Sequence, residues 1–187
     1  MIKHYLFAAN GPLNRDYFED ALKASHNGLT ITYFDESSGD VISDEKFFTE
    51  VESLLSPIHD DLGITISFLC SHENSIFARK LLKEAVSYFP NRCLFITDVL
   101  MKEMSFGDYS SLPELSSIFH DVPGDLMLTA GTYLRCGLDA CLAAQKLFIH
   151  RNTFNYRLNQ FIDYTHLDIR DYHNALLLEL YFQLASR

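Results

Sequence analysis

The sequence predicts an α+β protein in which a strand-containing N-terminal domain precedes an all-helical C-terminal domain. Up to about residue 96, short apolar or β-branched runs alternate with stretches of helical periodicity, whereas the last third has helical periodicity alone. Between these parts, residues 101–124 are rich in Ser, Gly and Pro, which is typical of a connector. We therefore expect two domains, residues 1–120 and residues 121–187.

In the N-terminal domain, the predicted order of elements is β-α-β-β-α-β-α-β. The expected elements are a strand at 2–9, a helix at 15–26 capped by Asn14, strands at 29–34 and 41–42 joined by a turn at 35–40, a helix at 44–55 ended or disrupted by Pro57, a strand at 64–69, a helix at 75–89 and a strand at 93–96. A hairpin placed between helices is the split β-α-β arrangement of ferredoxin-like and nucleotide-cyclase-like sheets. The sequence therefore predicts an α/β sandwich of this kind.

The C-terminal domain is expected to begin with a helix that Asp125 caps and Gly137 ends. A helix-turn-helix follows over residues 138–163, in which Ala143 and Ala144 give the first helix a surface that another helix can approach closely. The second helix has one apolar stripe, made of Phe154, Leu158, Phe161 and Ile162. A last helix, from about Asp171, is apolar almost all round and must be covered on more than one side.

Beside that apolar stripe lie arginine, asparagine and threonine side chains. Arginine presents a fork of donors to guanine or phosphate, asparagine pairs with adenine, and threonine offers a hydroxyl and a methyl group. In helix-turn-helix docking, the first turns of the second helix enter the major groove. The predicted DNA-binding residues are His150, Arg151, Asn152, Thr153, Asn155, Tyr156 and Arg157.

The string AAQKLFIHRNTFNYRLNQFIDYTHLDIRDYHNALLLELYFQL resembles the C-terminal helix-turn-helix of PucR/CdaR-type transcriptional regulators. The resemblance implies sequence-specific binding to double-stranded DNA. Asn155 departs from the pattern, because the family often has a basic residue there, and Arg151 and Arg157 are left as the formal positive charges of the helix. Residues 54–100 are similar in pattern to the degenerate GGDEF-like domain that often precedes this helix-turn-helix, which implies a sensing or dimerisation role.

The net charge of −10 is unusual for a protein that binds nucleic acid. Residues 1–120 contain 9 Lys and Arg against 18 Asp and Glu, whereas residues 121–187 contain 6 against 7. A nearly neutral reading domain attracts phosphates only weakly at long range, so affinity must come from base contacts and from two copies acting together. We therefore expect a homodimer.

Other chemistry is not expected. The N-terminal run is too short for a secretory signal and no segment is apolar enough to span a membrane, which predicts a cytoplasmic protein. The four cysteines have no metal-ligand spacing, and the hairpin has Ser37-Ser38-Gly39-Asp40 where a working cyclase has its signature. We expect no metal, cofactor or catalysis, and an effector small molecule is left open.

Two alternatives to a DNA-binding regulator remain. One is a structural or protein-interaction dimer that has lost DNA affinity, and the other is a nucleotide-binding, cyclase-like protein.

Overall fold

The computed structural model describes residues 3–185, which form two compact units divided between Asp108 and Tyr109. The division falls before the expected boundary near residue 120, because helix α5 (Leu112–Phe119) packs within the second unit. The ring of Phe119 lies 4.8 Å from that of Tyr181 and 6.4 Å from that of Phe161. Ile2, where the first strand was expected to begin, lies outside the described residues.

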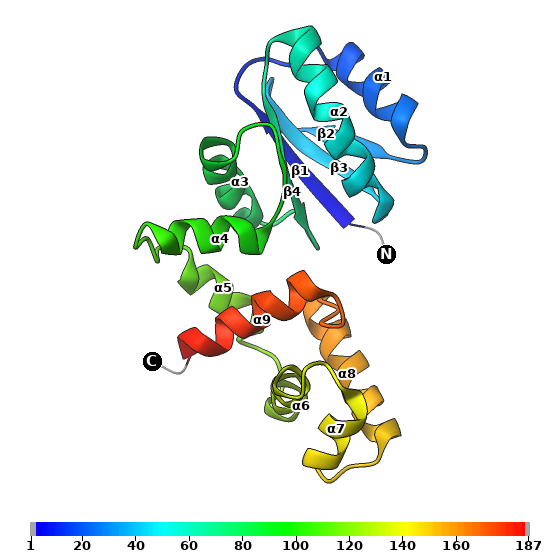
Figure 1. The fold of residues 1–187 in the computed structure, drawn as a ribbon, viewed down its shortest axis with the longest axis vertical. Helices are drawn as coiled ribbons and strands as arrows, with labels where there is room; N and C mark the ends of the chain where they lie inside the picture. The colour runs from blue at the N-terminus through cyan, green and yellow to red at the C-terminus, as the bar shows by residue number, and fades with distance from the viewer. Residues whose placement is uncertain (1–2, 186–187) are drawn as a thin grey trace. The chain divides into compact units, whose positions relative to one another are not determined.

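The first unit contains a sheet with the strand order β2-β3-β1-β4-β5 (Figure 1). Its strands are β1 (Lys3–Ala9), β2 (Thr30–Tyr33), β3 (Ser38–Ser43), β4 (Ile66–Ser71) and β5 (Cys93–Phe95). β1 is antiparallel to both of its neighbours, and β5 is parallel to β4. The first four strands thus have the split β-α-β topology, and the α+β class with a ferredoxin-like sandwich is confirmed.

Helices cover both faces of this sheet (Figure 1). On one face, α1 (Arg15–Ser25) and α2 (Lys46–Leu62) enclose a core of aromatic rings. This core includes Phe7, Phe18, Phe47 and Phe68, each at most 1% exposed. α3 (Ile76–Tyr88) packs against β1 and β4 from the other face, and α4 (Ile96–Ser105) packs on α3. Asn14 caps α1 as predicted, since its side chain accepts a hydrogen bond from the N–H of Tyr17 at 3.2 Å.

The expectation that Pro57 ends or disrupts the second helix is wrong. α2 continues through Pro57 to Leu62 and ends at Gly63, whose φ is 67°. Pro57 lies on the exposed side of the helix, while Ile58 next to it is 2% exposed. Burial of a further helical turn against the sheet therefore outweighs the loss of one backbone hydrogen bond.

The turn of the hairpin is also shorter than predicted, because Gly39 and Asp40 belong to strand β3. Gly39 pairs with Phe7 of β1 and with Tyr33 of β2. A Cβ atom at Gly39 would lie 2.4 Å from the carbonyl oxygen of Thr32 and 2.6 Å from Cζ of Phe7. The residue is glycine because the Phe7 ring occupies the space that a side chain would need.

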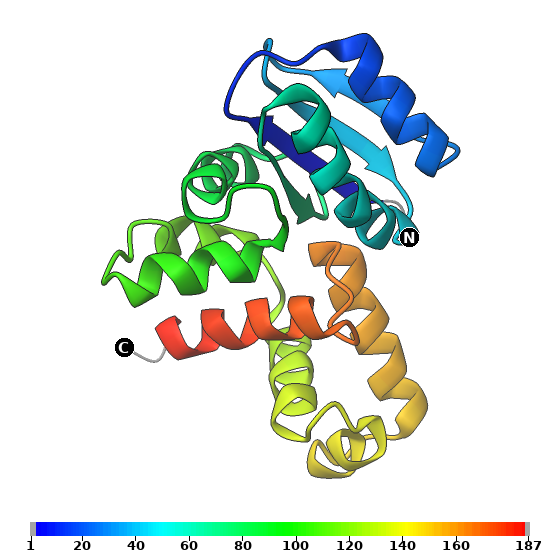
Figure 2. The same cartoon turned by 45° about the horizontal axis from the view of Figure 1, so that its top comes forward.

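The second unit is helical (Figure 2). After α5 come α6 (Gly124–Arg135), α7 (Ala140–Lys146), α8 (Arg151–Thr165) and α9 (Tyr172–Ala185). α6 contacts α7, α8 and α9, and it crosses α9 closely at Gly131, where a Cβ atom would lie 2.9 Å from Cζ of Phe182. Asp125 is not the cap of α6 as predicted, since the N-cap position is Pro123.

Candidate nucleic-acid interface

α7 is capped at its N-terminal end by a local side chain. The carboxylate of Asp139 accepts hydrogen bonds from the N–H groups of Cys141 and Leu142, at 2.8 and 2.9 Å. Ala143 and Ala144, at most 4% exposed, form the surface that α8 approaches, as predicted. Leu142, by contrast, is 41% exposed and does not belong to the buried side of the helix. The short helix is therefore held by its cap and by two small residues.

The apolar stripe of α8 fixes the orientation of this helix. Phe154, Leu158 and Phe161 are at most 4% exposed, and Ile162 is half-buried. The ring of Phe154 lies 5.6 Å from that of Tyr133 on α6. The predicted structural role of the stripe is thus confirmed by its burial, and its packing turns the opposite face of α8 outward.

His150 forms the N-cap of α8, a role that the sequence reasoning did not assign. Its Nδ1 accepts a hydrogen bond from the N–H of Asn152 at 3.2 Å. An accepting Nδ1 requires the neutral tautomer with the proton on Nε2, so this exposed imidazole still has one donor to offer. The first turn of α8 also provides the positive end of the helix dipole, which is suited to phosphate.

The first turns of α8 present most of the predicted residues to solvent. His150, Arg151, Asn152, Thr153, Asn155 and Tyr156 are all exposed. Tyr156 is 63% exposed, and its hydroxyl accepts a hydrogen bond from the side chain of Gln160 at 3.0 Å. The structure therefore brings these six residues together on one accessible end of the helix.

Arg157 has a different environment. Its side chain is 29% exposed, and its Nε lies 3.6 Å from Oδ2 of Asp125 in the first turn of α6. Arg151 has no carboxylate partner among residues 3–185, so it is the more available cation of the two. Sequence periodicity places Arg157 at the edge of the apolar stripe, but the acid that meets it comes from another helix.

Phe148 is a further candidate that the sequence reasoning treated only as part of the connection between the helices. It lies in the turn at residues 147–150 and is 96% exposed. Its backbone has a φ of 54°, in the left-handed region. No sequence signal distinguishes it, because a phenylalanine in a short turn is more often buried.

In the N-terminal unit, the turn of the hairpin is held by hydrogen bonds among its own residues. Asp35 accepts hydrogen bonds from the N–H of Ser37 and the hydroxyl of Ser38, both at 2.8 Å, and these bonds hold the pKa of its carboxyl below the usual value. The carboxylate of Asp35 thus occupies the turn that could have bound phosphate. Asp40 is 2% exposed and accepts from His4 at 2.6 Å and from Asn74 at 3.1 Å.

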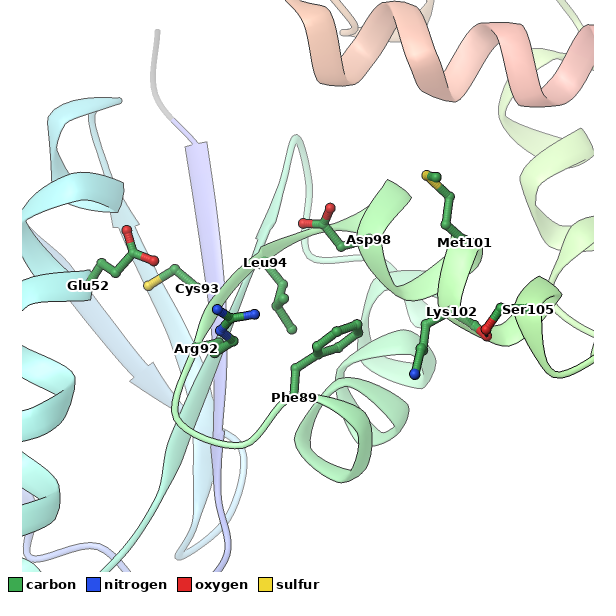
Figure 3. Close-up of a pocket in the computed structure, with 9 residues that line it drawn as sticks. All are labelled: Glu52, Phe89, Arg92, Cys93, Leu94, Asp98, Met101, Lys102 and Ser105. Atoms are coloured by element: carbon green, nitrogen blue, oxygen red, sulfur yellow. The ribbon is translucent and has the colours of Figure 1, made fainter.

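A hollow of about 530 Å³ opens beside the edge strand β5 in this unit (Figure 3). Its walls come from α2, the end of α3, β5 and α4, and they combine apolar side chains with both signs of charge. The residues that line it are Glu52, Phe89, Arg92, Cys93, Leu94, Asp98, Met101, Lys102 and Ser105. Its size is that of a small-molecule site.

Within residues 3–185, no three or more His, Cys, Asp or Glu side chains converge in a way that could hold a metal ion. None of the helices described combines the length and the apolar character needed to cross a membrane.

A short helix packed through alanines, a tight turn and a second helix with an exposed polar N-terminal end define a helix-turn-helix domain. Residues 126–184 match the model of the PucR C-terminal helix-turn-helix domain. The C-terminal unit is therefore a PucR/CdaR-type helix-turn-helix domain, and the resemblance seen in the sequence is confirmed for this unit.

Two curated proteins are similar to parts of the chain. The "Carbohydrate diacid regulator" of Escherichia coli (strain K12) is 31% identical over 103 residues, which cover 50% of this chain and 26% of that protein. The "Uncharacterized protein YxkF" of Bacillus subtilis (strain 168) is 32% identical over 66 residues, which cover 35% of this chain and 22% of that protein. The chain thus spans about a quarter of the length of these relatives.

Among solved structures, the "Regulator of Polyketide Synthase Expression" from Bifidobacterium adolescentis matches with a TM-score of 0.47 and 19% identity, over 100% of this chain and 83% of that one. A likeness of this degree carries no argument about function.

Proposed function

We propose that the chain is a sequence-specific DNA-binding transcriptional regulator of the PucR/CdaR type, which contacts its operator through the first turns of α8. The observation that carries the proposal is the exposed end of this helix, where His150, Arg151, Asn152, Thr153, Asn155 and Tyr156 face solvent while the apolar stripe is buried. The family match and the regulator among the relatives support it. Arg157 has the secondary role of a phosphate contact, because Asp125 competes for it.

Selection of bound duplexes from a random pool tests this proposal, followed by titration of the selected duplex at low and moderate salt. Arg151→Ala should then cost about 1 to 3 kcal/mol of specific binding, as expected for a base or phosphate contact of an arginine. Arg170→Ala is the matched control, because it removes the same charge beyond the opposite end of α8, where Arg170 is bound to Asp168 at 2.6 Å. Equal affinities of the wild-type chain and Arg151→Ala for the selected site would mean that α8 is not the reading helix.

We also propose that the regulator works as a homodimer. One copy offers few cations to DNA, since Arg157 is paired, and a single domain contacts only a short site. Residues Leu180, Tyr181, Phe182 and Leu184 of α9 are only half-buried, so apolar surface is available for association. A two-fold dimer would place its two α8 helices about 34 Å apart, or a multiple of that distance.

Sedimentation at micromolar concentration, with and without a duplex that carries a palindromic site, tests the dimer. We expect two chains per duplex. A chain that stays monomeric in both conditions would exclude the homodimer and leave the choice of reading helix untouched.

For the N-terminal unit, we propose a sensing or dimerisation role of the degenerate GGDEF-like kind, without catalysis. The filled hairpin turn and the buried Asp40 support the absence of phosphoryl chemistry, and the hollow beside β5 is where a small molecule would fit. Incubation with GTP and magnesium should give no turnover. If extensively purified protein still forms a cyclised or hydrolysed product, the nucleotide-cyclase alternative would be favoured instead.

A further inference from the structure

Phe148 combines two features that rarely occur together in a packed helical domain. Its side chain is 96% exposed, although the residues on both sides of it, Leu147 and Ile149, are half-buried. Its backbone φ is 54°, a left-handed conformation that crowds the Cβ atom of a bulky residue. The side chain thus buries almost no apolar area in the domain. The left-handed backbone conformation is also not favoured by phenylalanine.

Hydrogen bonds identify the position as the end of a Schellman motif. The N–H of Phe148 donates to the carbonyl of Gln145 at 3.0 Å, and the N–H of Ile149 donates to that of Ala144 at 3.1 Å. Glycine is the usual residue at this position, because it has no Cβ atom. α6 ends with the same motif: the N–H of Gly137 donates to Leu134 at 2.9 Å, and the φ of Gly137 is 65°. Two successive helices thus end alike, once with glycine and once with an exposed phenylalanine.

The surroundings of Phe148 point to a polyanion as the partner of its ring. The residue stands two positions before the N-cap His150 and three before Arg151, at the end of α8 that is proposed to enter the groove. Lys146, His150 and Arg151, which lie within three positions of it in the sequence, are all exposed. A second protein chain would more readily meet an apolar ring set among apolar neighbours. Cationic and polar neighbours instead match the edge of a DNA groove.

We propose that Phe148 is a specificity residue whose ring packs against the C5-methyl group of a thymine at the edge of the recognised site. The methyl group is the apolar feature of the major groove, and phenylalanine is among the side chains that contact it. The donors and acceptors of His150, Arg151 and Asn152 would read polar base edges. Phe148 would add the recognition of an apolar methyl group, which those polar side chains do not provide. The inference rests on the proposed function, because it needs the first turns of α8 to lie in the groove.

The test uses the full chain and the duplex that it selects from a random pool. Each thymine is replaced in turn by uracil, which removes only the methyl group. We expect one replacement to weaken wild-type binding about fourfold, the change for one methyl-sized group withdrawn from water. Phe148→Asn should weaken binding to the thymine duplex by about tenfold, since the whole ring contact is lost, and it should no longer distinguish uracil at that position.

The variant should not lose stability, which separates a binding effect from a folding effect. Asparagine adopts the left-handed conformation more easily than phenylalanine, so we expect the Tm of Phe148→Asn to equal or exceed that of the wild-type chain. Tyr164→Asn is the matched control: this residue is also an exposed aromatic, 58% exposed, at the other end of α8. Its replacement should leave DNA affinity unchanged.

Several outcomes would overturn the inference. If Phe148→Asn binds like the wild-type chain while Arg151→Ala binds weakly, Phe148 makes no contact and the proposed function stands. If neither variant changes binding, the proposed function of α8 fails as well. If Phe148→Asn weakens binding but no uracil replacement does, the ring does not meet a thymine methyl. If it keeps DNA affinity and turns a dimer into a monomer, the partner of the ring is a second copy of the chain.

Discussion

Asp125 Oδ2 lies 3.6 Å from Nε of Arg157, so the first turn of α6 holds the arginine on the flank of α8. The Asp125 side chain is 56% exposed, and an ion pair open to water in this way contributes about 0 to 1 kcal/mol to stability. Its main effect is therefore to neutralise part of the positive charge of α8. The pair turns one of the two arginines of this helix into a locally neutral group.

Asp125→Asn should consequently strengthen binding to non-specific duplex DNA and make it more dependent on salt. Arg157 becomes free to contact a phosphate, which should steepen the slope of log K against log salt concentration by about 0.9 per chain. Asp163→Asn is the control, because it removes an exposed acid of α8 that pairs with no arginine within residues 3–185 and should leave the slope nearly unchanged. Equal slopes for Asp125→Asn and Asp163→Asn would contradict the competition between Asp125 and phosphate.

Phe161→Ala should destabilise the helical unit by about 3 to 5 kcal/mol, the usual loss when a buried phenylalanine is truncated. The residue is 0% exposed, and its ring lies 6.4 Å from that of Phe119. Denaturant unfolding followed by circular dichroism measures the change. Tyr164→Ala, three residues further along and 58% exposed, should change stability by at most about 0.5 kcal/mol. Similar losses for both variants would show that the stripe is not the packed side of α8.

Gly39→Ala should destabilise the N-terminal unit by about 3 kcal/mol or more, because the strand cannot move away from its neighbours on both sides. The new Cβ atom would meet the carbonyl oxygen of Thr32 at 2.4 Å, and β3 is paired with both β1 and β2. Gly124→Ala provides the comparison, since no atom lies within 4 Å of a Cβ placed there. The thermal unfolding of both variants decides the point, and a Gly39→Ala chain as stable as the wild type would refute the steric argument.

Alkaline pH should weaken the N-terminal unit in a way that depends on Cys93. Burial raises the pKa of the Cys93 thiol from 9.0 to about 12, so the thiol stays protonated in the fold at pH values where the unfolded chain has lost that proton. The stabilisation is complete below pH 9 and is lost as the pH rises toward 12, by an amount on the order of 2 kcal/mol at pH 11.

The control for this pH effect is Cys141, whose thiol is exposed. Stability curves between pH 8 and 11 should flatten for Cys93→Ala and stay as in the wild-type chain for Cys141→Ala. Burial also raises the pKa of Tyr33 to about 12, so part of the slope should remain in Cys93→Ala. A slope that Cys93→Ala does not reduce would mean that the thiol is hydrated.

Local sequence signals predicted the elements well and their ends less well. Asn14 caps α1 as expected, because a cap depends mainly on the next three residues. The effects of Pro57 and Gly39 were misjudged, because each depends on a partner from elsewhere in the chain. α2 passes through Pro57 to bury Ile58, and Gly39 leaves room for the ring of Phe7.

By itself, the sequence determined the sandwich topology, the helix-turn-helix and the outward face of α8, since a stripe of period 3.6 defines both the buried and the exposed side of a helix. Only the tertiary structure decided how each side chain on that face is engaged. It paired Arg157 with Asp125, joined α5 to the helical unit and left Phe148 in solvent. These features depend mainly on contacts between residues far apart in the chain and on the backbone conformation of one turn, neither of which periodicity records.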